Sequence, residues 1–445
     1  MRRFRSIVAA ASAATLAATL AACSSAGASG GPVTLQYWLW DDTQQPAYQQ
    51  CADDFHQQNP DIDVKITQYA WSNYWTNLTT QLAAGSAPDV WVDQSSYYPQ
   101  FVQDKQIVDL QPYLDKDTSI DLGAYTEGLA DVWKVGDARY GLPKDWDTMG
   151  LVYRKDDLKK AGLTEKDMQD LTWNPTDGGT FGKVIARLTT DKSGRNGLDP
   201  AFDKSQVKTY GFLPEWADGS QGQNGWGNLA ASLGWTYADQ NPFGTKFNYD
   251  DPKLVSTISW LAGLSGQGYA PKFDAQSTLA RSEVLTNGGG ALTTLGSFNM
   301  SEYKGRTDEF GFAPLPAGPE GRKTTLNGLS DAIYNGSKHK DEAWKWVSYL
   351  ASPACQDTVA ETGVVFPALK EATDKAVAAR TKQGLNASIF QDELKTEGGT
   401  FSIPISYHGT EISQIVQDAI QSIALGGNPQ SALSQANSKV NALFK

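Results

Sequence analysis

The sequence lacks long apolar runs beyond its first 22 residues, and it lacks an excess of basic side chains. No later segment reaches the roughly 18 consecutive apolar residues of a membrane-spanning helix, so none is expected to cross a membrane. Lys and Arg together number 38 against 50 Asp and Glu, which gives a formal net charge of −12. Because nucleic-acid binding needs a basic patch, this balance argues against a nucleic-acid partner.

Cysteine is also scarce, with only three residues in the chain. Cys23 belongs to an N-terminal targeting pattern and is expected to carry a lipid. The other two, Cys51 and Cys355, form an even pair, which in an exported protein favours a disulfide. Two buried free thiols are the alternative that the sequence leaves open.

The N-terminus has the pattern of a lipoprotein signal peptide. Three arginines stand within the first five residues, and an alanine-rich apolar segment follows over residues 7–22. A Leu-Ala-Ala-Cys motif at residues 20–23 resembles the bacterial lipobox. We therefore expect a signal peptide over residues 1–22, a diacylglyceryl group on Cys23 and a flexible tether over residues 23–32. An ordinary signal peptide that is cut beside a cysteine is the alternative.

The chain is too long, at 445 residues, for one compact core, so two domains are expected. Strands predicted over residues 33–40, 64–69 and 89–92 alternate with two amphipathic helices, and this β-α-β-α-β order predicts a mostly parallel sheet. Ligands of such sheets lie outside the carboxyl ends of the strands. The residues at those ends, which become candidate binding residues, are Trp40, Asp41, Asp42, Asp93 and Gln94.

A central stretch over residues 140–154 is predicted to form one unusually long strand. Because side chains alternate along a strand, Asp145 and Asp147 share one face and Trp146 lies on the other. An unpaired buried carboxylate is costly, so this group is expected to line a wet cleft. An ordinary edge strand with solvated acids is the alternative.

The loop over residues 191–203 has a faint likeness to a calcium-binding loop. Arg195 occupies a ligand position, and no acidic residue closes the loop. The sequence therefore predicts no metal site here, and it predicts no cofactor elsewhere.

Further short motifs follow one another along nearly the whole chain. Beside the lipobox they are residues 34–38 with 59–60, residues 87–90, residues 140–143 with 151–155, residues 337–344 and residues 362–367. Each motif alone is weak, but their order and spacing are specific. On these stretches the chain resembles the extracellular solute-binding proteins of ABC importers, in the maltose-binding-like sugar branch.

The resemblance implies an α/β, two-lobe periplasmic-binding-protein-like fold that closes on its ligand about a hinge of crossing segments. It predicts lobe one over residues 33–146 and 329–367, lobe two over residues 147–323 and 372–445, and hinge segments over residues 145–149 and 324–328. On this layout Cys51 and Cys355 belong to the same lobe.

The resemblance also implies which positions line the cleft. They are the strand-end residues and the two central aspartates named above, together with Tyr74, Trp75, Gln223, Trp226, Phe298, Asn327, Gly328 and His408. The family often has Trp where Phe298 stands. A Phe can still stack on a sugar ring, but it cannot donate a hydrogen bond.

These residue types suit a sugar, because aromatic rings cover the C–H faces while carboxylates and amides bind neighbouring hydroxyls. The named positions include no Arg or Lys, which a phosphate would require, so a neutral sugar is expected. A peptide, a polyol or a sugar phosphate is the alternative ligand. The resemblance implies capture of a sugar or oligosaccharide and its delivery to the permease of an ABC transporter. The expected state is a monomer at the extracellular face of the bacterial membrane, attached only through its lipid.

Two other classes of protein remain as alternatives. A carbohydrate-active hydrolase also uses aromatics and paired acids, and Asp145 and Asp147 on one strand face could place their carboxyl groups about 5–7 Å apart. A non-transport surface lipoprotein would need no closing hinge. The lipobox and the family pattern favour capture, so neither enzyme activity nor a catalytic residue is expected.

Overall fold

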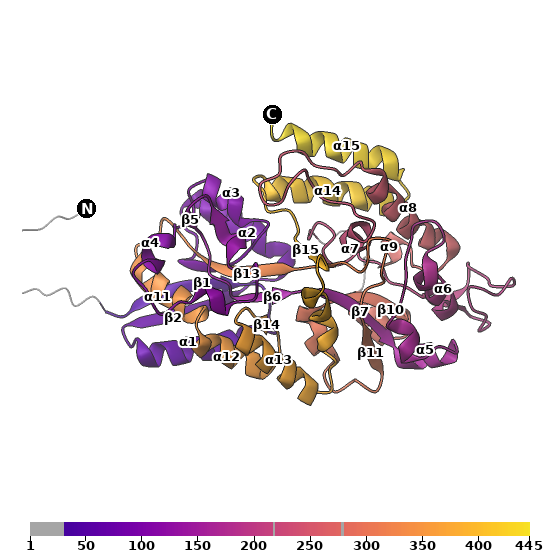
Figure 1. Ribbon diagram of the computed structural model, residues 1–445, viewed down its shortest axis with the longest axis horizontal. Helices are drawn as coiled ribbons and strands as arrows, with labels where there is room; N and C mark the ends of the chain where they lie inside the picture. The colour runs from indigo at the N-terminus through magenta and orange to yellow at the C-terminus, as the bar shows by residue number, and fades with distance from the viewer. Residues whose placement is uncertain (1–30, 217–218, 277–279) are drawn as a thin grey trace, which may run out of the picture.

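The computed structural model describes residues 31–216, 219–276 and 280–445, which form two α/β lobes side by side (Figure 1). The predicted signal peptide, Cys23 and nearly all of the tether lie outside the described residues. Within these ranges no helix is both long and apolar enough to cross a membrane.

Lobe one is built on a six-stranded sheet in the order β14–β6–β13–β3–β1–β2. Its parallel strands are β1 (Val33–Leu39), β2 (Ile62–Gln68) and β3 (Val90–Gln94), connected through α1 (Gln45–Gln58) and α2 (Trp71–Ala84). This arrangement confirms the predicted β-α-β-α-β order. The sheet continues with β13 (Asn327–Ile333), β6 (Asp145–Asp147) and β14 (Phe366–Pro367), each antiparallel to its neighbour.

Helices cover both faces of this sheet. Successive side chains of a strand point to opposite faces, and here apolar side chains occur on both. Tyr37 of β1 packs on one face with α1, α11 (Lys340–Leu350) and α12 (Pro353–Thr362). The next residue, Trp38, packs on the other face with α2 and α3 (Tyr98–Gln103). The carboxyl end of the sheet is left for the site described below.

A disulfide joins the two helices that cover the same face. Cys51 of α1 and Cys355 of α12 are bonded with a Cα–Cα distance of 5.3 Å, although 304 positions separate them in sequence. Both side chains are fully buried. The predicted disulfide is confirmed, and the alternative of two free thiols is excluded.

Helix α13 (Lys370–Lys382) lies beside α12 (Figure 1). Its Arg380 donates a 2.8 Å hydrogen bond from Nε to the carbonyl of Gly363, the residue that ends α12 in the left-handed region at φ 70°. Lys375 Nζ lies 2.6 Å from a carboxylate oxygen of Asp357 on α12. The helix thus packs against lobe one, whereas the sequence placed residues 372–445 in lobe two; the lobe boundaries stay a prediction.

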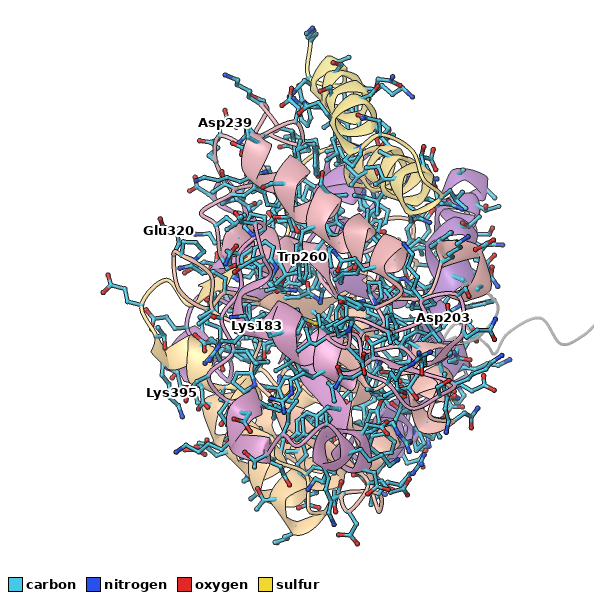
Figure 2. All side chains as sticks on the ribbon, turned by 90° about the vertical axis from the view of Figure 1, so that its right-hand side faces the viewer. Lys183, Asp203, Asp239, Trp260, Glu320 and Lys395 are labelled. Carbon is cyan, nitrogen blue, oxygen red and sulfur yellow. A yellow bond between two sulfur atoms is a disulfide. The ribbon has the colours of Figure 1, made fainter. Side chains whose placement is uncertain are left out.

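Lobe two has a smaller antiparallel sheet in the order β10–β7–β11, formed by Leu292–Gly296, Met149–Arg154 and Phe310–Ala313. Its core includes residues of α6 (Gly179–Leu188), α8 (Pro252–Gln267), α14 (Gly409–Ala424) and α15 (Pro429–Ala442). Trp260 of α8 packs on Phe181 of α6 with ring centroids 6.0 Å apart, and Figure 2 shows this face of the lobe.

The central stretch over residues 140–154 is not one long strand, so that prediction is wrong in extent. Asp145–Asp147 form β6 in the first sheet, whereas Met149–Arg154 form β7 in the second. Thr148 lies between them and donates a 2.6 Å hydrogen bond from Oγ1 to the carbonyl of Phe390. The strand is interrupted because its two halves pair with different sheets.

A second segment also divides between two sheets. Thr324–Thr325 form β12, which pairs with β15 (Thr400–Phe401), and Asn327 begins β13 in the first sheet. The Oγ1 atom of Thr324 accepts a 2.8 Å hydrogen bond from the backbone N–H of Met149. The two crossing segments therefore run side by side between the lobes.

Candidate functional site

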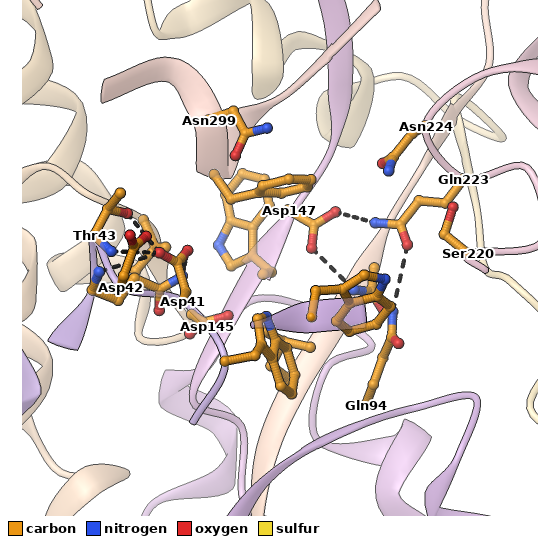
Figure 3. Close-up of a pocket in the computed structure, with 18 of the residues that line it drawn as sticks. Asp41, Asp42, Thr43, Gln94, Asp145, Asp147, Ser220, Gln223, Asn224 and Asn299 are labelled. Atoms are coloured by element: carbon orange, nitrogen blue, oxygen red, sulfur yellow. Dashed lines mark hydrogen bonds between the residues drawn. The ribbon is translucent and has the colours of Figure 1, made fainter. Parts of the chain in front are cut away.

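A cavity of about 330 Å³ lies between the lobes at the carboxyl ends of β1 and β3 (Figure 3). Lobe one contributes the loop after β1, the start of α2 and the ends of three strands. Lobe two contributes a loop at residues 220–224 and the 3₁₀ segment Ser297–Tyr303. The described residues that line the cavity are Trp40, Asp41, Asp42, Thr43, Gln44, Trp71, Gln94, Asp145, Trp146, Asp147, Ser220, Gln223, Asn224, Phe298, Asn299, Glu302, Asn327, Leu329 and Val365.

Strand register brings the polar floor of the cavity together. Leu329 of β13 pairs with Gln94 of β3 on one side and with Asp145 of β6 on the other. Asn327, two residues before Leu329 in β13, pairs with Asp147 of β6. Paired residues point to the same face of a sheet, so these three strands, far apart in sequence, together form the polar floor of the cavity.

Asp147 is the centre of a hydrogen-bond network across the cleft. One carboxylate oxygen accepts a 2.6 Å bond from Gln223 Nε2, and the other accepts a 3.0 Å bond from Asn327 Nδ2. Gln223 in turn accepts a 3.4 Å bond from Gln94 Nε2. Figure 3 shows this chain of side chains, which links lobe one directly to lobe two.

Asp145 also belongs to the polar floor, but it has fewer hydrogen-bond partners than Asp147. Its Oδ2 accepts a 3.2 Å hydrogen bond from the hydroxyl of Tyr48, and no described residue donates to its Oδ1. The neighbouring Lys144 points below the cavity floor, where its Nζ lies 3.1 Å from Asp331 Oδ1 and 3.9 Å from the ring centroid of Tyr48. Lys144 also donates to the hydroxyl of Tyr37.

Both aspartates titrate far from their ordinary range. Burial raises the pKa of Asp145 to about 7, against the opposing effect of the positive charge on Lys144. Burial also raises the pKa of Asp147 to about 7; the charge of Asp145 adds to the rise, and the hydrogen bonds from Asn327 and Gln223 oppose it. Near neutral pH the floor of the cavity can therefore hold or release protons.

The loop after β1 is shaped by Asp41. Its Oδ1 accepts hydrogen bonds of 2.8 Å from the backbone N–H of Thr43 and 2.7 Å from Thr43 Oγ1, and its Oδ2 accepts 2.7 Å from Gln44 Nε2. These bonds order the turn into α1. Asp42 is exposed at the cavity edge, and no described side chain or N–H donates to its carboxylate. Asp41 thus organises the loop, while Asp42 is available to a ligand.

Aromatic rings form the apolar part of the wall. The rings of Trp40 and Trp71 meet edge to face with centroids 5.3 Å apart, and both line the cavity while remaining partly exposed. Phe298 lines it from lobe two. Trp146 also borders it and stacks on Phe366 at 4.6 Å, which holds the indole against β14.

Nine of the predicted positions are brought together at this cavity. They are Trp40, Asp41, Asp42, Gln94, Asp145, Asp147, Gln223, Phe298 and Asn327. Their assignment as ligand-binding residues stays a prediction.

Three predicted lobe-one residues do not line the cavity. Tyr74 is fully buried and donates a 2.8 Å hydrogen bond to the carbonyl of Val92, and Trp75 stacks on Tyr97 at 3.8 Å. Asp93 is 1 % exposed and, like Trp91, points to the face of the sheet that α2 and α3 cover, opposite to Gln94. These side chains support the wall from behind.

Three more predicted residues also lie away from the cavity. Trp226 is 1 % exposed in the core of lobe two, in α7 (Trp226–Ala231). A side chain on Gly328 would meet Leu129 at 3.2 Å, so this position faces the interior of lobe one. His408 precedes α14 in the left-handed region at φ 62° and lies 3.7 Å from Glu411.

Several residues that line the cavity were not predicted from the sequence, chiefly Trp71, Ser220, Asn224, Asn299 and Glu302. Trp71 begins α2, at the carboxyl end of the strand before it, so the strand-end rule could have found it. Asn299 and Glu302 follow Phe298 in the same 3₁₀ segment. Ser220 and Asn224 lie in the same loop as the predicted Gln223, but the sequence does not show which side chains of this loop reach the cavity.

A second cavity of about 530 Å³ adjoins the first within lobe two. The two share Asn224, Phe298, Asn299 and Glu302 in their linings. The wall of the second cavity also carries Trp216, Phe273 and Tyr303, together with an ion pair between Arg281 and Glu215. The site can therefore accommodate a ligand longer than the first cavity alone would hold.

No group of three or more metal-ligating side chains occurs in the described part of the chain. In the loop at residues 191–203 the carboxylate of Asp191 is occupied by Arg195, whose Nε lies 2.7 Å away, and by the backbone N–H groups of Ser193 and Asp203. Arginine thus takes the place that a cation would need.

A protein-family model matches most of the chain. This model, described as bacterial extracellular solute-binding protein, matches residues 50–384. A binding protein of Brucella abortus is 24% identical over 425 residues, 94% of each chain. The maltodextrin-binding protein of Bacillus subtilis is 24% identical over 401 residues, 87% of this chain and 84% of that protein.

The fold also has solved counterparts. An ABC substrate-binding protein from Listeria monocytogenes, in complex with cycloalternan, has a TM-score of 0.80 at 19% identity, over 93% of this chain and 99% of its own. This likeness shows the shared two-lobe fold, and the match of the family model over most of the chain shows its membership. The chain belongs to the bacterial extracellular solute-binding protein family.

Proposed function

We propose that this protein captures a sugar or oligosaccharide in the cleft between its lobes and delivers it to the permease of an ABC transporter. The observation that carries the proposal is the composition of the cavity wall. Trp40, Trp71 and Phe298 stand beside the carboxylates and amides of Asp145, Asp147 and Gln223. Aromatic faces with hydrogen-bonding groups around them match the apolar faces and hydroxyl rim of a pyranose.

The size of the site and the relatives support this ligand class. The two adjoining cavities of about 330 and 530 Å³ leave room for more than one sugar unit. The maltodextrin-binding protein of Bacillus subtilis is a relative over most of the chain. The residues proposed to contact ligand are those of the first cavity, with Asp147 as the central polar contact.

Capture is proposed to proceed by closure of the lobes without breaking a bond. Gln94 and Gln223 belong to different lobes and already meet across the cleft. A ligand that bridges the lobes would shift an open–closed equilibrium toward the closed form. The closed monomer, held outside the cell by lipid on Cys23, would then dock on the permease.

Thermal shift against a panel of mono- and oligosaccharides tests the proposal, because a ligand that binds only the folded protein raises its melting temperature. A hit should also change Trp fluorescence, since Trp40 and Trp71 border the cavity. Chromatography of the hit after long incubation should return it intact; hydrolysed sugar would support the hydrolase alternative instead. Absence of any saccharide hit would contradict sugar capture.

A further inference from the structure

The first cavity carries many acids and no base. Its described lining includes Asp41, Asp42, Asp145, Asp147 and Glu302, but it includes no Lys, Arg or His. Desolvation within the cleft raises the pKa of Glu302, and the charges of Asp41 and Asp42 raise it further against the opposing effects of Ser282 and Arg281. The acids of both lobes therefore act on one another across the same space.

Two bases near the cavity, the buried Lys144 and the half-buried Arg281, are paired with acids outside its lining. Lys144 is 2 % exposed and is bound to Asp331 beneath the floor, so this pair is neutral together. Arg281 pairs with Glu215 in the adjoining cavity and donates a 2.8 Å hydrogen bond to Thr293 Oγ1. Each cation therefore has an acidic partner outside the first cavity and offsets the acids that line this cavity only in part.

Asp145 is buried, so the acids of the cavity are not all solvent-exposed surface residues. Its side chain is 2 % exposed and lines the cavity, and one of its two oxygens receives no hydrogen bond from the described residues. The charged form of a buried carboxylate without a full set of donors is unfavourable, and donors from a ligand would stabilise it. Asp147 stands two residues along, with both oxygens held in place by amide donors.

The aromatic residues fit the same ligand chemistry. Trp40 and Trp71 present indole rings at the wall beside Asp41 and Asp42. The face of an indole attracts a cation, most strongly where water is excluded. Two separate features of the wall, its charge and its rings, thus favour a ligand that is both ring-shaped and positively charged.

We propose that the ligand carries a protonated amine and is an amino sugar, bound with its ammonium group at Asp145. This inference rests on the proposed function of sugar capture and narrows its ligand class. An ammonium group offers three donors in place of the single donor of a hydroxyl, and its hydrogen bonds to carboxylates are charge-assisted. An ammonium group compensates the charged form of Asp145, whereas with a neutral sugar the raised pKa values of Asp145 and Asp147 favour proton uptake instead.

Matched sugars test the inference directly. The probes are glucosamine, galactosamine and mannosamine, each compared with its N-acetyl form and with glucose, galactose or mannose. Calorimetry at pH 7 is run with NaCl matched to the chloride of the amine salts. At least one amino sugar should bind about ten- to a hundredfold more tightly than both of its neutral counterparts, the range of one charged hydrogen bond.

Two variants test whether the preference for the amine depends on the charge of Asp145 or only on the net charge of the protein. Asp145→Asn keeps the shape of the side chain and should remove most of the preference for the amine. Asp137→Asn makes the same change of net charge at an exposed hairpin position and should leave the preference intact. If Asp145→Asn is unstable, Asp42→Asn at the exposed cavity edge serves instead. It should also weaken the preference for the amino sugar over its neutral counterparts.

The outcomes distinguish this inference from the proposed function. Neutral or N-acetylated sugars that bind as tightly as the amines would overturn the charge inference and leave sugar capture standing. Amino sugars that fail to bind while a neutral oligosaccharide binds would do the same. An equal preference in wild type and Asp145→Asn would show that the ammonium is held elsewhere, which also overturns the assignment.

Discussion

Replacing Asp147 with Ala tests the centre of the proposed site. The carboxylate is 6 % exposed, and it holds Gln223 of lobe two at 2.6 Å and Asn327 at the crossing segment at 3.0 Å. Through Gln223 it is also connected to Gln94 of lobe one. Asp147→Ala therefore removes the proposed contact to ligand and the side chain that positions two amides around it.

The expected loss of affinity follows from the hydrogen bonds that the carboxylate can make. A hydrogen bond to a charged group contributes about 1.5–3 kcal/mol, which corresponds to about ten- to a hundredfold in the dissociation constant. The two amide donors left behind face a cavity of about 330 Å³ that water can enter. Each then costs near the lower end of the usual range, about 1 kcal/mol, so the fold should persist.

Calorimetry with the best saccharide from the panel measures the change, and circular dichroism with thermal unfolding checks the fold. Asp147→Asn is the matched control, because an amide of the same shape can keep one hydrogen bond to Gln223 while losing the charge. We expect its affinity to lie between those of wild type and Asp147→Ala. Wild-type affinity in a folded Asp147→Ala protein would refute the assignment of this cavity as the site.

Three further predictions concern stability and anchoring. The double variant Cys51→Ser with Cys355→Ser should lower the free energy of unfolding by about 2–5 kcal/mol, because the bond closes a loop with a sequence separation of 304; urea denaturation that matches wild type would contradict this. Since the folded-state pKa values of Asp145 and Asp147 are raised from 3.8 to about 7, the folded protein binds more protons than the unfolded chain between these values. Stability should therefore fall as pH rises through that window, and thermal unfolding at several pH values should show a smaller fall in a double Asp→Asn variant at these positions. Cys23→Ala should abolish lipidation and release the protein from the membrane, and mass spectrometry that finds an unmodified Cys23 in the mature native protein would exclude the anchor.

The sequence by itself determined the local elements and the topology of lobe one. Alternating strands and amphipathic helices identified β-α-β-α-β, and the strand-end rule then located Trp40, Asp41, Asp42 and Gln94 at the cavity. These predictions succeed because periodicity and the position of strand ends are local properties. The cysteine pair could likewise be predicted, because an even count in an exported chain leaves few alternatives.

Tertiary structure decided which neighbour of each predicted residue faces the cavity. Gln94 lines it while Asp93 is buried behind the sheet, because adjacent side chains point to opposite faces. Trp71 lines it while Trp75, one turn further along α2, stacks on Tyr97. Helical periodicity indicates that the two share a side of α2, but not which of them reaches past the sheet edge.

Tertiary structure also decided what lobe two contributes. Ser220, Asn224, Asn299 and Glu302 enter the wall from segments far from the lobe-one strands in sequence. The central stretch divides at Thr148 because its halves pair with two different sheets, which no local pattern reveals. The site is formed by the approach of two lobes, and that approach is set by long-range strand pairing and packing rather than by any single segment.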